Sequence, residues 1–346
     1  MTCRGWERLL EEYVVPSELA GRRLSAVLSG RLGMSRRMLR RIIQAGGFYL
    51  NGEPVYLSVT VQDGDRVTWE RPEEEVAVDP EDIPLDICYE DDDVIVVNKP
   101  AGMLTHPSPH ERRGSLLAAA AHYLRRGGGV PHAVHRLDKY TSGAVLIAKH
   151  AHAHHQLDRA LRQGLVDRRY VAIVYAPEGC ETGRWLTFVD GLAPNPHRPS
   201  RRIVVPPDRG DRAVTHVLPL VQAGPLALVA LVLETGRTHQ IRAQMAFHGM
   251  PLVGDRDYTY ALANRRDPLG QASFYEKAFG RQALHAYALS WPRVEDRAMC
   301  KVRAPVANDM RELWQTVSGQ DDMEAWCDKA QDIEPPGDPM YGQTNA

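Results

Sequence analysis

The chain has 346 residues, 43% of them hydrophobic, and a formal net charge of −2. This length and composition allow at least one large buried core and leave room for two domains. The five cysteines are scattered and none forms a C-x-x-C pair, which argues against a disulfide framework or a zinc knuckle. The first thirty residues contain glutamates and no apolar run of signal-peptide length, and no later segment approaches a membrane span. We therefore expect a cytoplasmic protein without a membrane partner.

Basic residues are concentrated near the start of the chain, where residues 22–42 hold seven arginines and no acid. Ser35 is a favourable N-cap for a helix that begins at the next residue. At about 100° per residue, this helix has one apolar face and one cationic face. A face of arginines without an acid favours phosphate binding over plain solvation, because the planar guanidinium bonds phosphate at two points. The apolar face comprises Met38, Leu39, Ile42 and Ile43, and the cationic face comprises Arg36, Arg37, Arg40 and Arg41.

Two turn signals and an acidic segment follow this helix. Asn51-Gly52 between short apolar runs predicts a β-hairpin, and Gly64-Asp65 predicts a second turn. Residues 71–84 combine acids with prolines and cannot bury enough apolar surface to fold alone, so they are interpreted as a linker. The acidic residues 315–346 show little periodicity and are expected to form a disordered tail.

The region between linker and tail, residues 85–314, contains many apolar runs of strand length. Ser115 precedes an alanine-rich helix, and a second helix is expected over residues 153–164. Because strands outnumber helices at irregular spacing, we predict an α+β fold with a mixed, mostly antiparallel central sheet and flanking helices. The strands are predicted at residues 94–97, 170–175, with Tyr170 at the first position, 202–205, 213–217 and 226–233.

Two segments of this region place charged residues at a turn beside a buried strand. The first is His135–Gly143, H-R-L-D-K-Y-T-S-G, which leads into the apolar run 144–149. The second is Val232–Arg242, V-L-E-T-G-R-T-H-Q-I-R, in which the apolar strand precedes the turn. An acid at such a sheet margin, here Asp138, is a candidate functional group. The alternative is that it caps the turn and pairs with Arg136.

Together these segments resemble the signatures of the RluA-type family of RNA pseudouridine synthases, H-R-L-D-x-x-T-S-G and G-R-T-H-Q-I-R. Residues 16–70, after a leader of residues 1–15, resemble the RNA-binding domain first known from ribosomal protein S4. The resemblance implies the pseudouridine synthase fold behind a small N-terminal α/β-hairpin domain that binds RNA. The likeness to the synthases spans residues 85–306 and continues, in order, at N-K-P-A-G (98–102), R-Y-V-A (169–172), G-D (254–255) and R-Q-A-L-H-A (281–286).

The resemblance also implies a reaction in which the bond from ribose to N1 of uridine is broken and the base is rejoined through C5. It implies a covalent, nucleophilic role for Asp138. It places the active-site tyrosine at Tyr170, whose ring can pack on the base while its hydroxyl transfers a proton. The arginine that closes the second segment is Arg242, and an arginine beside a carboxylate favours the ionised acid. This isomerisation requires no metal or organic cofactor.

Three further residues are expected to contact the substrate. Arg136 is expected to help evert the target nucleotide or to occupy the space that it leaves, since a guanidinium can stack where a base stood. Ile241 is expected to form the floor of the pocket, and Lys99 of the N-K-P-A-G segment is expected to bind substrate. The chain departs from the family at Tyr140, where an acid is more common.

Three other interpretations have less support. A non-catalytic RNA-binding or ribosome-assembly protein would need the N-terminal arginines but not Asp138, Tyr170 and Arg242. A hydrolase that uses Ser142 with His135 and Asp138 is disfavoured, because the chain lacks a G-x-S-x-G elbow. A metal site is disfavoured because the spacing of the clustered histidines matches no metal motif; these are His150, His152, His154 and His155.

The partner expected from the sequence is RNA. A separate RNA-binding domain joined to the larger region makes ribosomal RNA, and its large-subunit RNA in particular, the first expectation, with transfer RNA second. We expect the protein to act as a monomer.

Overall fold

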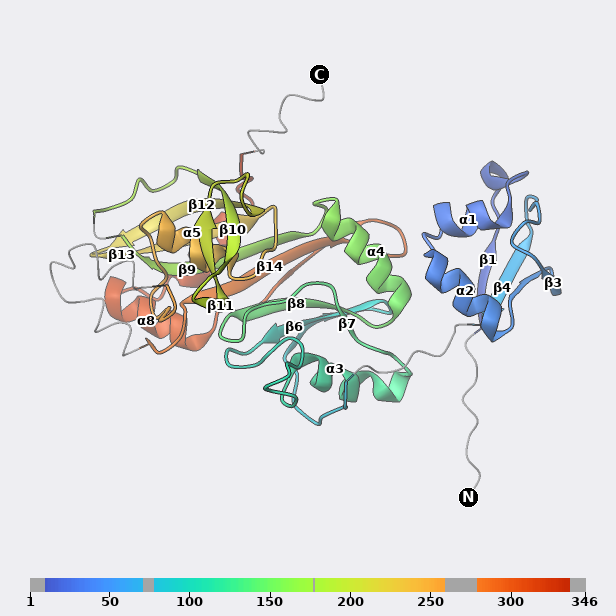
Figure 1. Cartoon of the computed structure of the whole chain (residues 1–346), viewed down its shortest axis with the longest axis horizontal. Helices are drawn as coiled ribbons and strands as arrows, with labels where there is room; N and C mark the ends of the chain where they lie inside the picture. The colour runs from blue at the N-terminus through green and yellow to red at the C-terminus, as the bar shows by residue number, and fades with distance from the viewer. Residues whose placement is uncertain (1–9, 71–77, 177, 259–278, 337–346) are drawn as a thin grey trace.

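The computed structural model describes residues 10–70, 78–176, 178–258 and 279–336. A small N-terminal domain lies beside a larger body that is built around one long sheet (Figure 1). In these four stretches, no helix is both long and apolar enough to cross a membrane.

The N-terminal domain packs two helices against a four-stranded antiparallel sheet with the strand order β1-β4-β2-β3. The predicted Asn51-Gly52 hairpin turn is confirmed, because both residues have positive φ angles, 53° and 88°, between β2 and β3. The elements are β1 (Leu10–Val14), a 3-10 helix (Ser17–Leu19), α1 (Leu24–Gly30), α2 (Arg36–Ala45), β2 (Phe48–Leu50), β3 (Glu53–Val55) and β4 (Arg66–Glu70).

This domain begins earlier than the sequence predicts. The predicted leader covers residues 1–15, but β1 pairs along its length with β4, from Leu10 opposite Glu70 to Val14 opposite Arg66. The leader prediction is therefore wrong for residues 10–15, and residues 1–9 lie outside the described part of the chain. The physical reason is that an edge strand is held by hydrogen bonds to its neighbouring strand and does not require an apolar run in its sequence. None of the five residues of β1 is fully buried, so no apolar pattern marks this strand.

The predicted arginine helix is α2. The Ser35 hydroxyl accepts a hydrogen bond from the Met38 amide at 3.1 Å, as an N-cap does. Leu39 and Ile42 are buried in the domain core, whereas Ile43 is 51% exposed, so its predicted place in the packing face is wrong. The face of α2 that packs on the domain core is therefore narrower than the apolar face predicted from the helical spacing. The cationic face is presented outward, with Arg36, Arg37 and Arg40 exposed and Arg41 half-buried.

The larger body contains an eleven-stranded sheet with the order β11-β10-β12-β13-β9-β14-β8-β6-β5, to which β15 adds beside β14 and β7 beside β8. The strands are β5 (Ile87–Glu90), β6 (Val94–Lys99), β7 (His132–Ala133), β8 (Ser142–Ala148), β9 (Asp167–Tyr175), β10 (Leu186–Asn195), β11 (Arg198–Val205), β12 (Asp211–Ala223), β13 (Leu226–Leu233), β14 (Leu284–Pro292) and β15 (Met299–Arg303).

The prediction of a mixed, mostly antiparallel sheet is confirmed. Among the described strands, β8 and β14 pair in parallel and the other pairs are antiparallel. Gly143 lies at this parallel junction with a φ of 114°, and a Cβ there would lie 2.2 Å from the Ala286 carbonyl oxygen. Glycine at position 143 therefore allows β8 and β14 to approach, and this contact joins the two halves of the sheet.

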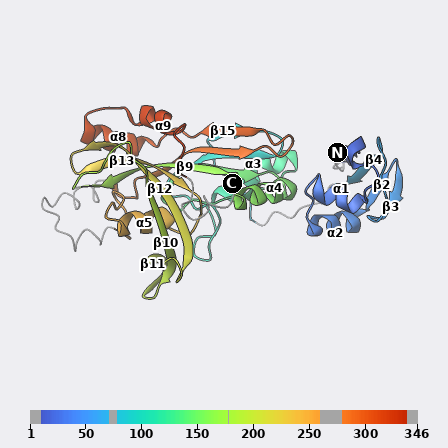
Figure 2. The same ribbon diagram turned by 90° about the horizontal axis from the view of Figure 1, so that it is seen from above.

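Helices cover both faces of the sheet, as Figure 2 shows for α5 on one side and α8 and α9 on the other. Alternate residues of β9 separate the two cores: Tyr170 and Ala172 pack with α3 and α5, whereas Val171 and Ile173 pack with α8 and α9. Such two-sided burial explains the continuous apolar runs of the central strands. The helices are α3 (Leu116–Leu124), α4 (Ala151–Arg162), α5 (Gln240–Phe247), α8 (Asn308–Ser318) and α9 (Met323–Ala330).

The structure corrects two expectations for the larger body. Strand β9 starts at Asp167, so Tyr170 is its fourth residue and not its first. The predicted disordered tail is wrong for residues 315–318 and 323–330, which form the end of α8 and all of α9. Met323 and Cys327, four residues apart, are fully buried, and this short apolar stripe holds the acidic helix against the core. Residues 337–346 lie outside the described part of the chain.

The linker prediction can be followed only in part, since residues 71–77 lie outside the described residues. Residues 78–84 lie against the larger body: Val78 packs on its core, and the Glu81 carboxylate accepts a hydrogen bond from the Gly114 amide at 2.9 Å. The two domains meet at α4, where the Gln156 amide donates to the Leu32 carbonyl at 2.7 Å.

Candidate active site

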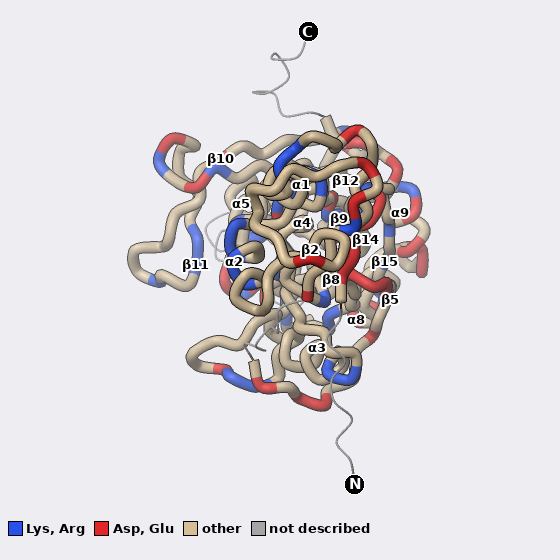
Figure 3. The backbone as a smooth tube through the Cα atoms, turned by 90° about the vertical axis from the view of Figure 1, so that its right-hand side faces the viewer, with Lys and Arg blue, Asp and Glu red and all other residues tan. Residues whose placement is uncertain are grey.

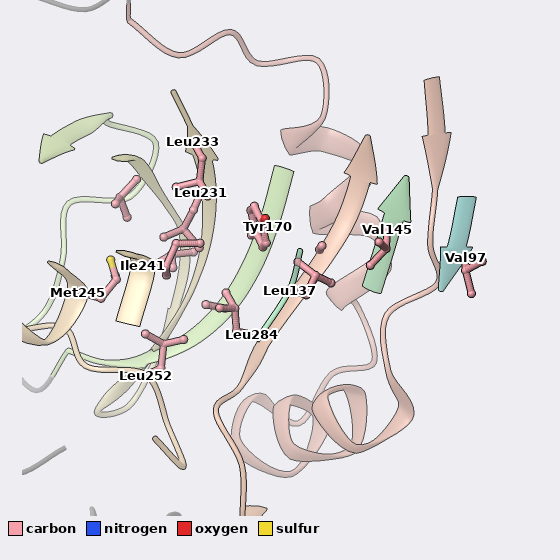
Figure 4. Packing of buried hydrophobic residues seen from close by; sticks show 14 of the residues in the cluster. Val97, Leu137, Val145, Tyr170, Leu231, Leu233, Ile241, Met245, Leu252 and Leu284 are labelled. Atoms are coloured by element: carbon pink, nitrogen blue, oxygen red, sulfur yellow. The ribbon is translucent and has the colours of Figure 1, made fainter. Parts of the chain in front are cut away.

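The two signature segments meet at one cavity of about 530 Å³. Asp138 reaches it from the loop before β8, Tyr170 from β9, and Arg242 from the first turn of α5. Figure 4 shows Tyr170 on its strand, with Ile241 and Leu137 coming from separate elements toward the same core. Sheet pairing of β9 with β13 and β14 brings together segments far apart in the sequence.

Arg242 contacts Asp138 directly. Its Nη1 lies 3.3 Å from Asp138 Oδ2, and the Asp138 side chain is 17% exposed. The same guanidinium donates through Nε and Nη2 to the two oxygens of Asp255, at 2.7 and 2.8 Å, and through Nη2 to Asp257 at 3.0 Å. Burial opposes the charge, but Asp255 and the other carboxylates outweigh it and raise the pKa of Arg242 above its usual value. The arginine is therefore a fixed cation beside Asp138.

The turn before α5 brings His239 to the same carboxylate. His239 has a left-handed backbone, with a φ of 56°, at the N-cap of α5, and its Nε2 lies 3.9 Å from Asp138 Oδ2. Its Nδ1 and the Tyr258 hydroxyl are 3.0 Å apart. Burial lowers the pKa of His239, although Asp138 opposes this effect. A non-glycine residue in this backbone region is strained, and such strain is concentrated at functional sites.

Tyr170 is 5% exposed and belongs to the core that lies under the cavity. Burial raises the pKa of its phenol above the usual value; the Arg168 cation opposes this effect and the Asp138 carboxylate adds to it. The hydroxyl is therefore protonated at neutral pH. Tyr170 thus brings both an apolar ring and a protonated hydroxyl to the residues that line the cavity.

Of the three other residues predicted to contact substrate, two line the cavity and one does not. Arg136 lines the cavity and is exposed, and Ile241 lines it with 4% of its surface exposed. Lys99 lies outside this cavity and is fully buried. Its Nζ donates to the backbone carbonyls of Pro100, Met103 and Lys139, at 2.9, 2.8 and 3.2 Å. Lys99 thus holds the residue after Asp138 in place, and its contact with substrate stays a prediction.

Three acidic or aromatic partners of Arg242 were not given a role from the sequence, namely Asp255, Asp257 and Tyr258. Asp255 follows Gly254 in a segment that the sequence already singles out, so its side chain could have been suspected. The Asp257 carboxylate also pairs with Arg201 of β11 at 2.5 Å. The Tyr258 ring stacks 5.1 Å from the Arg242 guanidinium. No periodicity or spacing rule predicts these contacts, because they join α5, β11 and a loop.

The hydrolase arrangement does not form. The Ser142 hydroxyl lies 2.9 Å from Nδ1 of His285 and not beside His135, and the His135 Nε2 accepts from the Leu146 amide at 3.2 Å. Within the described ranges, no group of histidines, cysteines and acids could hold a metal ion. His150, one of the clustered histidines, caps α4 by accepting from the Ala153 amide at 3.1 Å.

The four arginines of α2 do not join the cavity. They lie on the N-terminal domain, where Figure 3 shows α2 as a basic segment on the side of the molecule that faces the viewer. The structure therefore has two separate features: a cavity with a carboxylate and arginine pair, and a cationic helix face.

Comparison with known proteins identifies the family of this chain. The chain matches the family model described as RNA pseudouridylate synthase over residues 93–247, and the S4 domain model over residues 22–67. It is 36% identical over 351 residues to the ribosomal large subunit pseudouridine synthase D of Neisseria meningitidis serogroup B, a match that covers 92% of this chain and 90% of that protein.

Two further matches cover most of the matched protein's length. An uncharacterized RNA pseudouridine synthase of Bacillus subtilis is 37% identical over 290 residues, which are 82% of this chain and 96% of that protein. The solved structure of the human RNA pseudouridylate synthase domain containing 4 protein has a similar fold, with a TM-score of 0.53 and 22% identity over 67% of this chain and 92% of that one.

The family model and the relatives define the class of this protein, an isomerase with an RNA-binding domain. The chain belongs to the RNA pseudouridine synthase family and carries an S4 domain before its catalytic domain.

Proposed function

We propose that this protein converts specific uridines of large-subunit ribosomal RNA to pseudouridine, with Asp138 as the nucleophile. The observation that carries the proposal is the ion pair of Asp138 and Arg242 at the wall of a cavity shared with Tyr170. The substrate follows the name of the Neisseria relative, a ribosomal large subunit pseudouridine synthase. Transfer RNA is the second candidate. A cytoplasmic location follows from a ribosomal substrate.

The target uridine leaves its stack to reach Asp138, because this carboxylate is 17% exposed at a cavity of about 530 Å³. Arg136 is exposed beside the cavity, and its guanidinium takes the space that the everted base leaves. The base then enters between the Tyr170 ring and Ile241, both of which line the cavity.

The reaction proceeds through one covalent intermediate. An Asp138 oxygen bonds to C1′ of the ribose, and the electron pair of the C1′–N1 bond leaves with the uracil. The detached base turns in the cavity, C5 bonds to C1′, and the Asp138 carboxylate leaves. The C5 proton is lost and N1 gains a proton, so the product is an isomer of the substrate. The Tyr170 hydroxyl is positioned to assist this proton transfer.

The S4 domain supplies affinity for the RNA through α2. Its four arginines carry no acid among them, so their phosphate contacts add attraction without reading the sequence of the RNA. The choice of uridine then depends on how the RNA reaches from the α2 face to the cavity.

Asp138→Asn tests the nucleophile. The side chain keeps its shape but loses the charge, so we expect pseudouridine formation to fall by at least about 10³-fold while RNA affinity changes less than about threefold. Single-turnover assays with ribosomal RNA fragments and filter binding measure the two quantities. A variant that retains near wild-type turnover contradicts the assignment.

The RNA target is tested by mapping pseudouridines in total RNA from cells with and without the gene. Loss of one or more sites in large-subunit RNA supports the proposal, and loss in transfer RNA alone replaces it by the second candidate. An unchanged map, together with retained RNA binding by the purified protein, favours a non-catalytic RNA-binding role.

A further inference from the structure

Two buried N–H donors of the active-site cavity have no hydrogen-bond acceptor. Arg168 and His135 both line the cavity, with 6% and 8% of their surfaces exposed. Nε of Arg168 and Nδ1 of His135 are buried, and neither has a partner among the described residues. Buried donors are almost always satisfied in folded proteins, so two in one wall require an explanation.

Arg168 is a cation without a carboxylate partner in the described part of the chain. Its guanidinium makes one long hydrogen bond, from Nη2 to the Leu233 carbonyl at 3.4 Å. The acids of the cavity have other partners: Asp138 pairs with Arg242, and Glu234 pairs with His216 at 2.8 Å. A buried cation without a carboxylate partner is unfavourable in the free protein, and a negative ligand would compensate for it.

His135 adds a neutral donor beside this cation. Because its Nε2 accepts from the Leu146 amide at 3.2 Å, the ring hydrogen is on Nδ1. Burial lowers the pKa of His135 to about 3, and the nearby Arg168 cation acts in the same direction. The imidazole is therefore neutral at physiological pH and presents Nδ1–H as a donor.

The fold leaves room for the Arg168 guanidinium. Arg168 and Tyr170 are two residues apart on β9, so their side chains point to the same face of the sheet. A Cβ at Gly236, in the second signature segment, would lie 2.6 Å from Arg168 Nη1. The guanidinium is therefore held between Gly236 and the Leu233 carbonyl, on the face that carries the Tyr170 ring.

We propose that Arg168, assisted by His135 Nδ1–H, binds a carbonyl oxygen of the everted uracil and stabilises the negative charge that the base carries after its bond to C1′ breaks. The inference rests on the proposed function. The leaving electron pair on N1 is delocalised onto O2 and O4, and a donor aimed at either oxygen acts most strongly on this anion. Arg242 is less suited, since three carboxylates already surround its charge.

A phosphate of the RNA is the other ligand that a cation could take. The depth of the site favours the base, because Arg168 is buried whereas Arg136 and Arg237 are exposed at the same cavity. Phosphates of a nucleotide strand stay near the surface, while the everted base enters the recess.

The test compares Arg168→Met and Arg168→Lys with wild type in single-turnover reactions on uridine RNA. Arg168→Met should lower kcat by about 10²- to 10³-fold and change KM by less than about threefold, and Arg168→Lys should retain part of the lost rate. The matched control is Arg184→Met, which removes a 70% exposed arginine outside this cavity that pairs with Glu181. It should stay within about twofold of wild type.

A second substrate tests whether Arg168 stabilises the anion of the detached base or only packs against neighbouring residues. In 6-azauridine a ring nitrogen replaces C6–H, so the detached base is a more stable anion and needs less help from the protein. The loss caused by Arg168→Met should be at least about tenfold smaller on this substrate than on uridine. Equal losses on both substrates would overturn the proposal.

Gly236→Ala provides a variant that keeps Arg168 but displaces its guanidinium. It should lower kcat on uridine with unchanged RNA affinity, and it decides the question if Arg168→Met fails to fold. A rise in KM with a shallower salt dependence and unchanged kcat would identify a phosphate ligand and overturn the proposal.

Failure of the proposed function and failure of this inference give different results. If wild type itself forms no pseudouridine, the proposed function fails. If wild type is active and Arg168→Met matches it, only this inference fails.

Discussion

At the scale of single residues, the site depends on how one arginine is shared. Arg242 donates to Asp255 at two points and to Asp138 at one, and the Asp255 side chain is fully buried. A planar guanidinium can donate hydrogen bonds to both carboxylates at once. A lysine ammonium on a flexible side chain cannot reproduce this fixed arrangement of N–H donors. The position of the Asp138 carboxylate therefore depends on the shape of its partner as well as on the charge.

Arg242→Lys should lower pseudouridine formation by about 10²-fold or more while the protein stays folded, because the charge near buried Asp255 is kept. Single-turnover rates and thermal unfolding measure the two effects. Arg256→Lys, a change at an exposed neighbour, is the control and should alter neither. A fully active Arg242→Lys enzyme would show that charge alone is sufficient.

Two buried histidines predict how stability depends on pH. Burial lowers the pKa of His135 to about 3 and that of His285 to about 4, below the value of about 6.5 in an unfolded chain. Between these values the unfolded state binds protons that the folded state excludes. Their contribution to stability is therefore complete above pH 6.5 and is lost progressively as the pH falls toward 4.

From pH 7.5 to 5.5 each of these histidines should reduce the free energy of unfolding by about 1.4 kcal/mol. Urea unfolding at the two pH values measures the difference. His285→Asn should make the difference smaller by about this amount, whatever its effect at pH 7.5. The matched change at the exposed His197, His197→Asn, should leave the difference as in wild type; the same difference in all three proteins would contradict the prediction.

At the scale of elements, the sequence predicted helix ends correctly where the hydrogen-bond partners lie within the same element. The N-caps Ser35 and Ser115 each accept the amide three residues ahead, because a cap is a local contact. The start of β9 was missed because Asp167, Arg168 and Arg169 are charged. Arg169 pairs with Asp167 on the same strand, but it also donates to the Ala330 carbonyl at the end of α9, which is far away in the sequence.

The α2 face gives a prediction at this scale. Arg36→Glu with Arg40→Glu should weaken RNA binding and make the slope of log K against log salt shallower by about 0.7–0.9 for each phosphate that the variant no longer binds. Titrations at several salt concentrations measure the slope. Arg125→Glu with Arg126→Glu, a pair of exposed arginines after α3, is the control and should leave the slope unchanged. An equal slope for wild type and the α2 variant would exclude this face from phosphate binding.

At the scale of the whole molecule, the described part of the acidic C-terminal region, residues 315–336, is part of the catalytic body. Met323 and Cys327 of α9 lie in the same core as Val171 and Ile173 of β9, and Val171 is the strand residue next to Tyr170. The acids of this region are paired as well, with Glu324 bound to Arg303 at 3.1 Å. The region therefore supports the strand that carries Tyr170 from the face opposite the cavity.

Cys327→Asp should reduce the free energy of unfolding by roughly 3 kcal/mol or more, since it places a carboxylate in an apolar core. Ala325→Asp adds the same charge on the exposed side of α9 and should change stability by less than about 0.5 kcal/mol. Thermal or urea unfolding compares the two. Equal effects would mean that α9 is not packed as the structure has it.

The sequence by itself determined the family, the mostly antiparallel sheet and the cationic helix, and it predicted Asp138, Tyr170 and Arg242 as candidate site residues, because short motifs and local periodicity carry that information. Only the tertiary structure decided that Lys99 supports a loop, that residues 315–318 and 323–330 are helical, and that Arg168 Nε and His135 Nδ1 have no acceptor among the described residues. The physical reason is distance along the chain. Asp138 and Arg242 are 104 residues apart in sequence, and no local pattern encodes which buried donor lacks a partner.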